Sequence, residues 1–197
     1  MCGDRFYSAA EENAEGYELS LFGSYQRKNA ENVLAAVRAL RDRGWNIPEE
    51  AVRKGLKETV WPARFEILRR DPAFILDAGH NPQCAGAVAG AVREYFKGEK
   101  VTFLIGMLRD KDYSEVIEIL LPCASDFICV TPESDRALNS EDLASRIREL
   151  SGKAAAYGTI EEGLEEALRR KKDTVAFGSF YMAGKIRRIM RERGMVK

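Results

Sequence analysis

A strand end, a turn and a helix start are predicted together by one stretch of this chain, Ile75-Leu-Asp-Ala-Gly-His-Asn-Pro82. An apolar run ends in an aspartate, a glycine allows the backbone to turn, and Asn81-Pro82 has the residue types of a helix cap and a first helical residue. This order predicts Asp77 and His80 at the carboxyl end of a buried strand. The helix that follows presents free N–H groups at its start, which attract anions.

His80 is the only histidine in the chain. A single histidine is often a structural residue whose ring is satisfied by its surroundings. Here its place between a glycine and a helix cap, at the sheet edge where open α/β proteins bind ligands, favours a functional role. An imidazole ordinarily titrates at about pH 6.5, which suits the handling of protons or phosphate near neutrality.

From Phe65 to the C-terminus, apolar runs typical of strands alternate with patterns typical of helices. This alternation predicts an α/β fold, a Rossmann-like and mainly parallel sheet flanked by helices on both faces. The predicted strands are Phe65–Leu68, Phe74–Asp77, Val101–Ile105, Phe127–Val130, Ala154–Tyr157 and Thr174–Phe177. The predicted helices are Pro82–Phe96, Ser114–Leu121, Ser140–Leu150, Ile160–Arg170 and Tyr181–Arg193.

Upstream of this region the pattern is helical. Apolar residues at three- and four-residue spacing predict an amphipathic helix from Lys28 to Arg43, ended by Gly44. A second helix is predicted to open at Pro48, with Ala51, Val52, Leu56 and Val60 on one face. Proline disfavours helix in the residue before it, so the boundary is placed at Trp61-Pro62. The domains are therefore expected to be residues 1–60 and 61–197.

Composition excludes some classes of partner. The 197 residues carry 31 basic and 31 acidic side chains, a balance that favours neither nucleic acid nor an anionic membrane. The basic run from Arg169 to Lys172 is expected to be a solvated helix end. No apolar run is long enough to span a bilayer and the N-terminus has no signal-peptide order, so we expect a cytoplasmic protein.

The cysteines Cys2, Cys84, Cys123 and Cys129 show neither paired spacing nor histidine partners. They are expected to be reduced thiols, and no metal site is predicted. Cys84 lies three residues into the helix after His80 in this scheme, so a cysteine–histidine nucleophile is a weaker alternative.

Five motifs occur in order along the chain and carry a resemblance to a known family. They are Leu21-Phe-Gly-Ser-Tyr-Gln-Arg-Lys-Asn-Ala30, Trp61-Pro-Ala-Arg-Phe-Glu66, Asp77-Ala-Gly-His-Asn-Pro82, Gly106-Met-Leu-Arg-Asp-Lys-Asp112 and Phe177-Gly-Ser-Phe-Tyr181. In this order they resemble the C-terminal half of folylpolyglutamate synthase/dihydrofolate synthase. That family belongs to the Mur ligase-like ATP-dependent amide ligases. Two positions depart from the family's pattern. Tyr25 stands where the family usually has histidine, and Asp77-Ala-Gly-His80 inverts the family's commoner Asp-Gly-Ala-His order.

The resemblance implies a Mur ligase C-terminal domain, preceded by a helical remnant of the central ATPase domain. In the family, ATP phosphorylates a carboxylate and an amine then attacks the acyl phosphate. The implied ligands are folate, L-glutamate, ATP and Mg²⁺. The family's phosphate-binding loop and magnesium ligands lie in an N-terminal part that this sequence does not contain. The chain is therefore expected to be inactive alone, and a separate chain that supplies this N-terminal part is one partner that the resemblance implies.

Arg64 has a planar array of donors that suits phosphate, although a structural pairing with Glu66 or Asp71 is equally compatible with the spacing. The resemblance favours contact with the ATP phosphates. Asp77 suits either a ribose hydroxyl or a cap on the following turn. The resemblance implies that Asp77 and His80 are the catalytic pair on this domain's face of the site, and that Asn29 lies near the adenine.

Lys111 follows a strand end, where it can meet an anionic ligand or lie in a solvated turn; the resemblance favours a role in substrate binding. Ser179 ends the last strand, where its hydroxyl and nearby N–H groups suit a substrate carboxylate. A role as an ordinary N-cap is at least as well supported.

Gly178-Ser-Phe-Tyr-Met-Ala-Gly-Lys185 is superficially similar to a phosphate-binding loop. It has five residues between its glycines where the Walker A pattern has four, and Ile186 stands where that pattern has Ser or Thr. We therefore exclude it. Two alternative functions remain at this point: a stand-alone nucleotide-binding or interaction module that has lost ligase chemistry, and a fragment of a muropeptide ligase.

Overall fold

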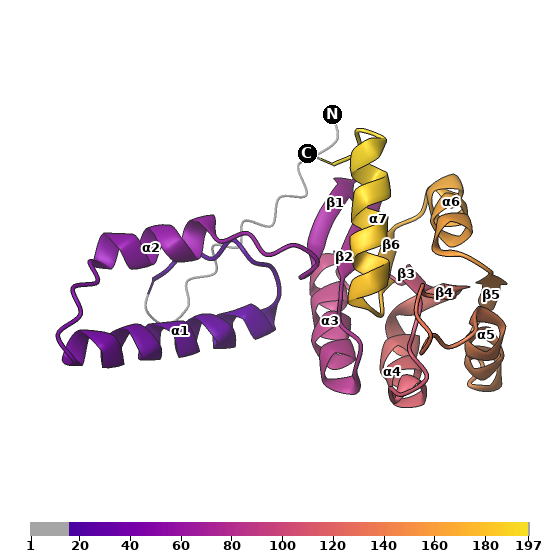
Figure 1. Ribbon diagram of the computed structural model, residues 1–197, viewed down its shortest axis with the longest axis horizontal. Helices are drawn as coiled ribbons and strands as arrows, with labels where there is room; N and C mark the ends of the chain where they lie inside the picture. Colours follow the sequence, from indigo (N-terminus) through magenta and orange to yellow (C-terminus); the bar gives the residue numbers. More distant parts are fainter. Residues whose placement is uncertain (1–15, 197) are drawn as a thin grey trace. The chain divides into compact units, whose positions relative to one another are not determined.

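A computed structural model describes residues 16–196 (Figure 1). The chain divides into two compact units between Trp61 and Pro62.

The first unit contains two helices, α1 (Ser24–Asp42) and α2 (Glu49–Glu58). Its small core consists of Tyr17, Leu34 and Val52, with partly buried apolar neighbours. The Tyr17 hydroxyl donates a 2.6 Å hydrogen bond to Oε1 of Glu49. This contact ties the segment before α1 to the start of α2.

Three predictions for this unit need correction. Helix α1 begins at Ser24 and not at Lys28, because its first turn is polar and gives no apolar signal. Helix α2 ends at Glu58, and the extended backbone of Thr59 places Val60 outside it, with 81% of that residue exposed. Ala51 is also exposed, so Val52 is the buried residue of the predicted face and Leu56 is half-buried. The predicted end of the first helix is confirmed, since Gly44 has a φ of 87° just beyond it.

The second unit is a six-stranded sheet with helices on both faces, which confirms the predicted fold class. Its strands are β1 (Glu66–Arg70), β2 (Ala73–Asp77), β3 (Val101–Ile105), β4 (Ala124–Val130), β5 (Ala154–Tyr157) and β6 (Thr174–Phe177). Its helices are α3 (Pro82–Tyr95), α4 (Tyr113–Leu120), the short 3₁₀ helix η1 (Leu121–Cys123), α5 (Ser140–Glu149), α6 (Ile160–Arg170) and α7 (Phe180–Glu192).

The strand order is β1-β2-β6-β3-β4-β5, with β1 antiparallel at one edge and the other strands parallel. Strand β6 enters between β2 and β3, which precede it in the chain. The connections therefore change direction around these three strands. In open α/β sheets, ligands bind at the carboxyl ends of strands where this change occurs.

The central strands are buried on both faces, as their continuous apolar sequence requires. Alternate residues such as Leu76, Leu104 and Ile128 pack with α6 and α7 in one cluster. Helices α3, α4 and α5 cover the opposite face (Figure 1). There Phe103 stacks on Phe127 with ring centroids 5.7 Å apart.

Element boundaries shift slightly from the predictions. Strand β1 begins at Glu66 because Phe65 has a φ of 46° and belongs to the preceding loop. Strand β4 begins at Ala124 and not at Phe127, because its first residues include polar ones that an apolar pattern does not detect. Helices α4 and α7 each begin one residue earlier than predicted. Strands β3, β5 and β6 and helix α6 have the predicted bounds.

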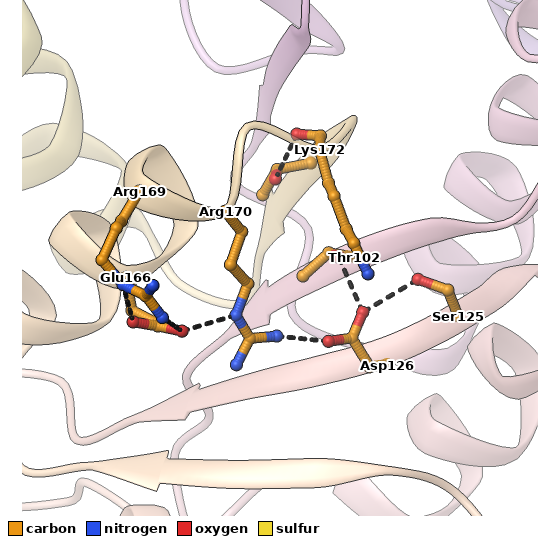
Figure 2. A network of polar contacts seen from close by, with 8 residues as sticks. Thr102, Ser125, Asp126, Glu166, Arg169, Arg170 and Lys172 are labelled. Atoms are coloured by element: carbon orange, nitrogen blue, oxygen red, sulfur yellow. Dashed lines mark hydrogen bonds and ion pairs between the residues drawn. The ribbon is translucent and has the colours of Figure 1, made fainter.

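A polar network crosses the amino ends of β3 and β4, at the edge opposite the strand carboxyl ends (Figure 2). Asp126 accepts hydrogen bonds from Thr102 at 2.7 Å and from Arg170, and Arg170 also pairs with Glu166 at 2.7 Å. In the basic run at the end of α6, Arg169, Lys171 and Lys172 are exposed, as expected for a solvated helix end, whereas Arg170 is half-buried in this ion-pair network. Within residues 16–196, no helix is long and apolar enough to cross a membrane.

Candidate functional site

The turn after β2 forms as the sequence predicts. Asn81 is the N-cap of α3, and its Oδ1 accepts a 2.8 Å hydrogen bond from the Cys84 backbone N–H. Pro82 occupies the first turn, where its missing N–H costs nothing. Gly79 has no room for a side chain, since a Cβ there would lie 2.5 Å from the Phe177 ring. The turn is therefore pressed tightly against the neighbouring strand β6.

Asp77 ends β2 and is only 3% exposed. Its Oδ1 accepts a 2.7 Å hydrogen bond from the Gly79 N–H, and its Oδ2 accepts one of 2.9 Å from the Phe65 N–H. Burial raises the pKa of this carboxyl, while the two backbone hydrogen bonds and the charge of Arg64 oppose the rise. Of the two roles open from sequence, the structure shows the cap on the turn, and adds a bond to a second loop.

That second loop carries Arg64. The residues on either side of it, Ala63 and Phe65, have φ values of 56° and 46°, which are uncommon for residues with a Cβ. Three hydrogen bonds hold this conformation: Phe65 N–H to Asp77, Ala63 N–H to the Glu66 carboxylate, and Ala78 N–H to the Ala63 carbonyl. Strained backbone that is held this firmly is typical of functional sites.

Arg64 does not pair with Glu66 or Asp71. The Glu66 carboxylate is engaged by Arg187, at 3.0 Å from its Nε. Among the described residues, the Arg64 guanidinium makes no hydrogen bond or ion pair, and its Cζ lies 5.7 Å from the centroid of the Phe180 ring. Its N–H donors are thus available to an anion, which fits a phosphate-binding role.

His80 follows Gly79 and is half-buried. Its Nδ1 lies 3.3 Å from the Ala78 carbonyl oxygen. A carbonyl only accepts, so this contact favours the tautomer with the proton on Nδ1, which leaves Nε2 as an acceptor. The imidazole centroid is 6.1 Å from that of Phe180. Phe180 therefore contacts both Arg64 and His80.

Ser179 is the N-cap of α7, and its Oγ accepts a 3.2 Å hydrogen bond from the Met182 N–H. The structural role is thus present, while the hydroxyl proton is still available as a donor. Gly178 before it has a φ of 146°, and a Cβ there would lie 2.0 Å from the Gly106 carbonyl oxygen. This close approach brings the ends of β6 and β3 together.

Lys111 comes from the loop after β3, at the same edge of the sheet. Its Nζ lies 3.9 Å from Asp110, a carboxylate that Arg136 contacts at 3.1 Å. None of the described contacts of Lys111 reaches Arg64 or His80. Asn29 belongs to α1 in the other unit, where its amide donates a 2.9 Å hydrogen bond to Gln26.

The weaker alternative of a cysteine–histidine nucleophile receives no support from the described residues, and the excluded phosphate-loop pattern lies mostly in a helix. Among the described residues no hydrogen bond joins His80 to the Cys84 thiol, so a cysteine–histidine nucleophile is not assembled there. Lys185, in the sequence that is only superficially similar to a phosphate-binding loop, lies within the regular helix α7 and forms ion pairs with Glu133 and Glu161. Within residues 16–196, no group of three or more His, Cys, Asp or Glu side chains is arranged to hold a metal ion. Cys2 lies outside the described residues.

Sequence reasoning missed Phe180 as a member of this site. An aromatic residue after a strand gives no signal by itself, and its two contacts come from distant parts of the chain. The available signal was its place directly after Ser179, in the first turn of a helix at the functional edge.

Comparisons with known proteins show the family and the fold of this chain. The sequence model of the family described as "Mur ligase, glutamate ligase domain" matches residues 63–179 of this chain. The dihydrofolate synthase/folylpolyglutamate synthase of Escherichia coli is 29% identical over 165 residues, which cover 82% of this chain and 38% of that protein.

Solved structures give the same result. E. coli FolC in complex with DHPP and ADP matches with a TM-score of 0.81 and 27% identity, covering 91% of this chain and 42% of that one. The Mycobacterium tuberculosis folylpolyglutamate synthase complexed with ADP and AMPPCP matches with a TM-score of 0.81 and 27% identity, covering 88% and 42%. The chain thus spans about two fifths of the length of these relatives. The resemblance seen in the motifs is confirmed, and this chain belongs to the Mur ligase family through its glutamate ligase domain.

Proposed function

We propose that this chain is the C-terminal portion of an ATP-dependent ligase that joins L-glutamate to folates, of the folylpolyglutamate synthase/dihydrofolate synthase type. The observation that carries the proposal is the Arg64 guanidinium at the strand ends. Among the described residues it makes no hydrogen bond or ion pair, and the nearby Asp77 carboxylate, on whose pKa its charge acts, is occupied by backbone N–H groups. A cation kept unpaired at this edge suits the phosphate groups of the reaction.

Each residue of the site has a proposed role. Arg64 contacts phosphate oxygens, where charge develops when the substrate carboxylate is activated. His80 presents Nε2 towards the reacting groups, and Lys111 attracts the anionic substrate. Ser179 and the N-terminus of α7 bind the carboxylate of the incoming glutamate.

Asp77 is proposed to position the loop of Arg64 and the turn of His80, since its two carboxylate oxygens accept hydrogen bonds from the backbone of Phe65 and of Gly79. A direct contact with the nucleotide ribose requires a hydroxyl to reach a carboxylate that is 3% exposed. Asn29 is proposed to lie near the adenine, and residues 1–60 to be the end of the central ATPase domain.

ATP supplies the phosphoryl group that activates the carboxylate. The donors of Arg64 fit its phosphate groups, whereas no metal-binding cluster occurs among residues 16–196. From the family resemblance, and not from this absence, we propose that the Mg²⁺ ligands lie in the part of the relatives that this chain does not span. The free thiols Cys84, Cys123 and Cys129 agree with a cytoplasmic location.

The test combines this chain, fused or mixed, with an N-terminal folylpolyglutamate synthase segment that carries a phosphate-binding loop. The assay supplies ATP, Mg²⁺ and L-glutamate with dihydropteroate or tetrahydrofolate, and follows phosphate release and product mass. Ligation by the combination, and none by either part, supports the proposal. Nucleotide binding without ligation would favour the stand-alone module, and ligation to a muropeptide precursor alone would favour that family branch.

A further inference from the structure

Two large aromatic residues begin α7, and both are unusually exposed. Phe180 and Tyr181 each have 57% of their surface accessible. Exposed aromatic side chains in the first turn of a helix contribute little to a core. Their position directly after Ser179, at the carboxyl edge of the sheet, calls for another explanation.

The two residues differ in their contacts. The Phe180 ring lies 5.7 Å from Cζ of Arg64 and 6.1 Å from the centroid of His80, with 55° between the two ring planes. Among the described residues, Tyr181 makes no ring contact with either side chain. Phe180 is therefore the aromatic residue that links the Arg64 loop, the turn after β2 and the start of α7.

An aromatic partner has a specific advantage for an arginine that must bind an anion. A carboxylate partner would occupy the guanidinium donors and neutralise its charge. The face of a ring attracts the cation through its quadrupole and leaves the N–H donors for a ligand. The neighbouring carboxylate Glu66 is kept away by Arg187.

We propose that Phe180 is a positioning residue, which holds Arg64 and His80 in place for the anionic groups of the ligase reaction. This inference rests on the proposed function for its catalytic consequence. The contact itself can be tested without any activity.

The first experiment is NMR spectroscopy of this chain. His80 is the only histidine in the sequence, so its ring Hε1 signal is unique. Phe180→Ala and Phe180→Leu should shift this signal and that of the Arg64 Nε–H, because both variants remove the ring. Phe180→Tyr should keep both signals near their wild-type positions, and so should the matched control Tyr181→Ala. Unchanged signals in Phe180→Ala would overturn the proposal, whatever the activity.

The second experiment measures ligation by the chain combined with the N-terminal segment. Phe180→Ala and Phe180→Leu should lower kcat by about 3- to 30-fold, the range of a cation–π contact, and leave the KM for glutamate unchanged. Phe180→Tyr should restore the rate. In an Arg64→Ala background, Phe180→Ala should cause a smaller loss of kcat than it does in the wild type, because only its effect through His80 remains.

A full and independent loss in that background would overturn the positioning role. So would wild-type kcat in Phe180→Ala. An inactive wild-type combination would instead refute the proposed function, and the NMR signals would then decide the Phe180 contact by themselves.

Discussion

The Asp77 carboxylate accepts a 2.9 Å hydrogen bond from the backbone N–H of Phe65, a residue in the loop before β1. The same carboxylate binds the Gly79 N–H, so one buried side chain fixes the loop of Arg64 and the turn of His80 together. The two candidate ligand-binding side chains therefore depend on a residue that is itself almost inaccessible.

We expect Asp77→Asn to lower stability and loosen both loops. An asparagine amide has one accepting oxygen, so one buried N–H loses its partner, at a cost of about 1–3 kcal/mol. Relief of the buried charge offsets part of this cost. Amide hydrogen exchange should accelerate at Phe65 or Gly79, while Asp135→Asn, at an exposed loop position, should have no effect. Unchanged exchange at both amides would contradict the positioning role of Asp77.

Gly178 and Gly184 differ in the space available for a side chain. A Cβ at Gly178 would lie 2.0 Å from the Gly106 carbonyl oxygen, and its φ of 146° is unfavourable for other residues. Gly178→Ala should therefore cost more than about 3 kcal/mol of unfolding free energy. Gly184 lies within α7 with open space around it, so Gly184→Ala should stabilise by about 0.5–1 kcal/mol. Denaturant unfolding of both variants checks the opposite signs.

The Glu166 network predicts a pH dependence of stability (Figure 2). Hydrogen bonds from Arg169 and then Arg170 lower the pKa of Glu166 to about 2. The carboxyl group of a glutamate in an unfolded chain has a pKa of about 4.3. Because the folded pKa is the lower one, the stabilisation is complete above the unfolded pKa and is lost as pH falls towards 2.

Glu166→Gln should therefore be less stable than the wild type at pH 6, and this difference should shrink between pH 4 and pH 2. Thermal unfolding across that range measures it. Glu149→Gln, which removes a single exposed ion pair with Arg146, is the control. A difference that stays constant down to pH 2 would show that the charge of Glu166 does not stabilise the fold.

The sequence predicted the sheet edge but not the contacts made there. Strand ends and caps are local, so the positions of Asp77, His80 and Ser179 could be inferred from apolar runs and Asn81-Pro82. The positive φ of Ala63 and Phe65 could not, because neither residue type signals it; tertiary hydrogen bonds impose it. The contact of Phe180 with Arg64 joins segments far apart in the chain, and only the parallel sheet brings them together.

The two units should differ in protection from hydrogen exchange. The first unit has a small core cluster around Tyr17, Leu34 and Val52, whereas the central strands of the second are fully buried. Amides of β2, β3 and β6 should therefore exchange much more slowly than those of α1 and α2. Equal protection in α1 and β2 would contradict the assignment of residues 1–60 as the end of another domain.

The last prediction separates a ligand-binding Arg64 from a structural one. Because Arg64 makes no ion pair or hydrogen bond among the described residues, Arg64→Ala should lower the melting temperature of this chain only slightly, through the lost Phe180 ring contact and the lost charge near Asp77. In combination with the N-terminal segment, the same variant should lower ligation by on the order of 10²-fold or more, since a donor to developing charge is lost. Arg64→Lys should recover part of the rate, because lysine keeps the charge but not the planar donor array. Arg191→Ala, at an exposed position in the last turn of α7, removes the same charge away from the strand ends and should retain wild-type ligation. If Arg64→Ala instead lowers the melting temperature strongly while the folded fraction ligates at the wild-type rate, then Arg64 stabilises its loop and the phosphate contact must come from another residue.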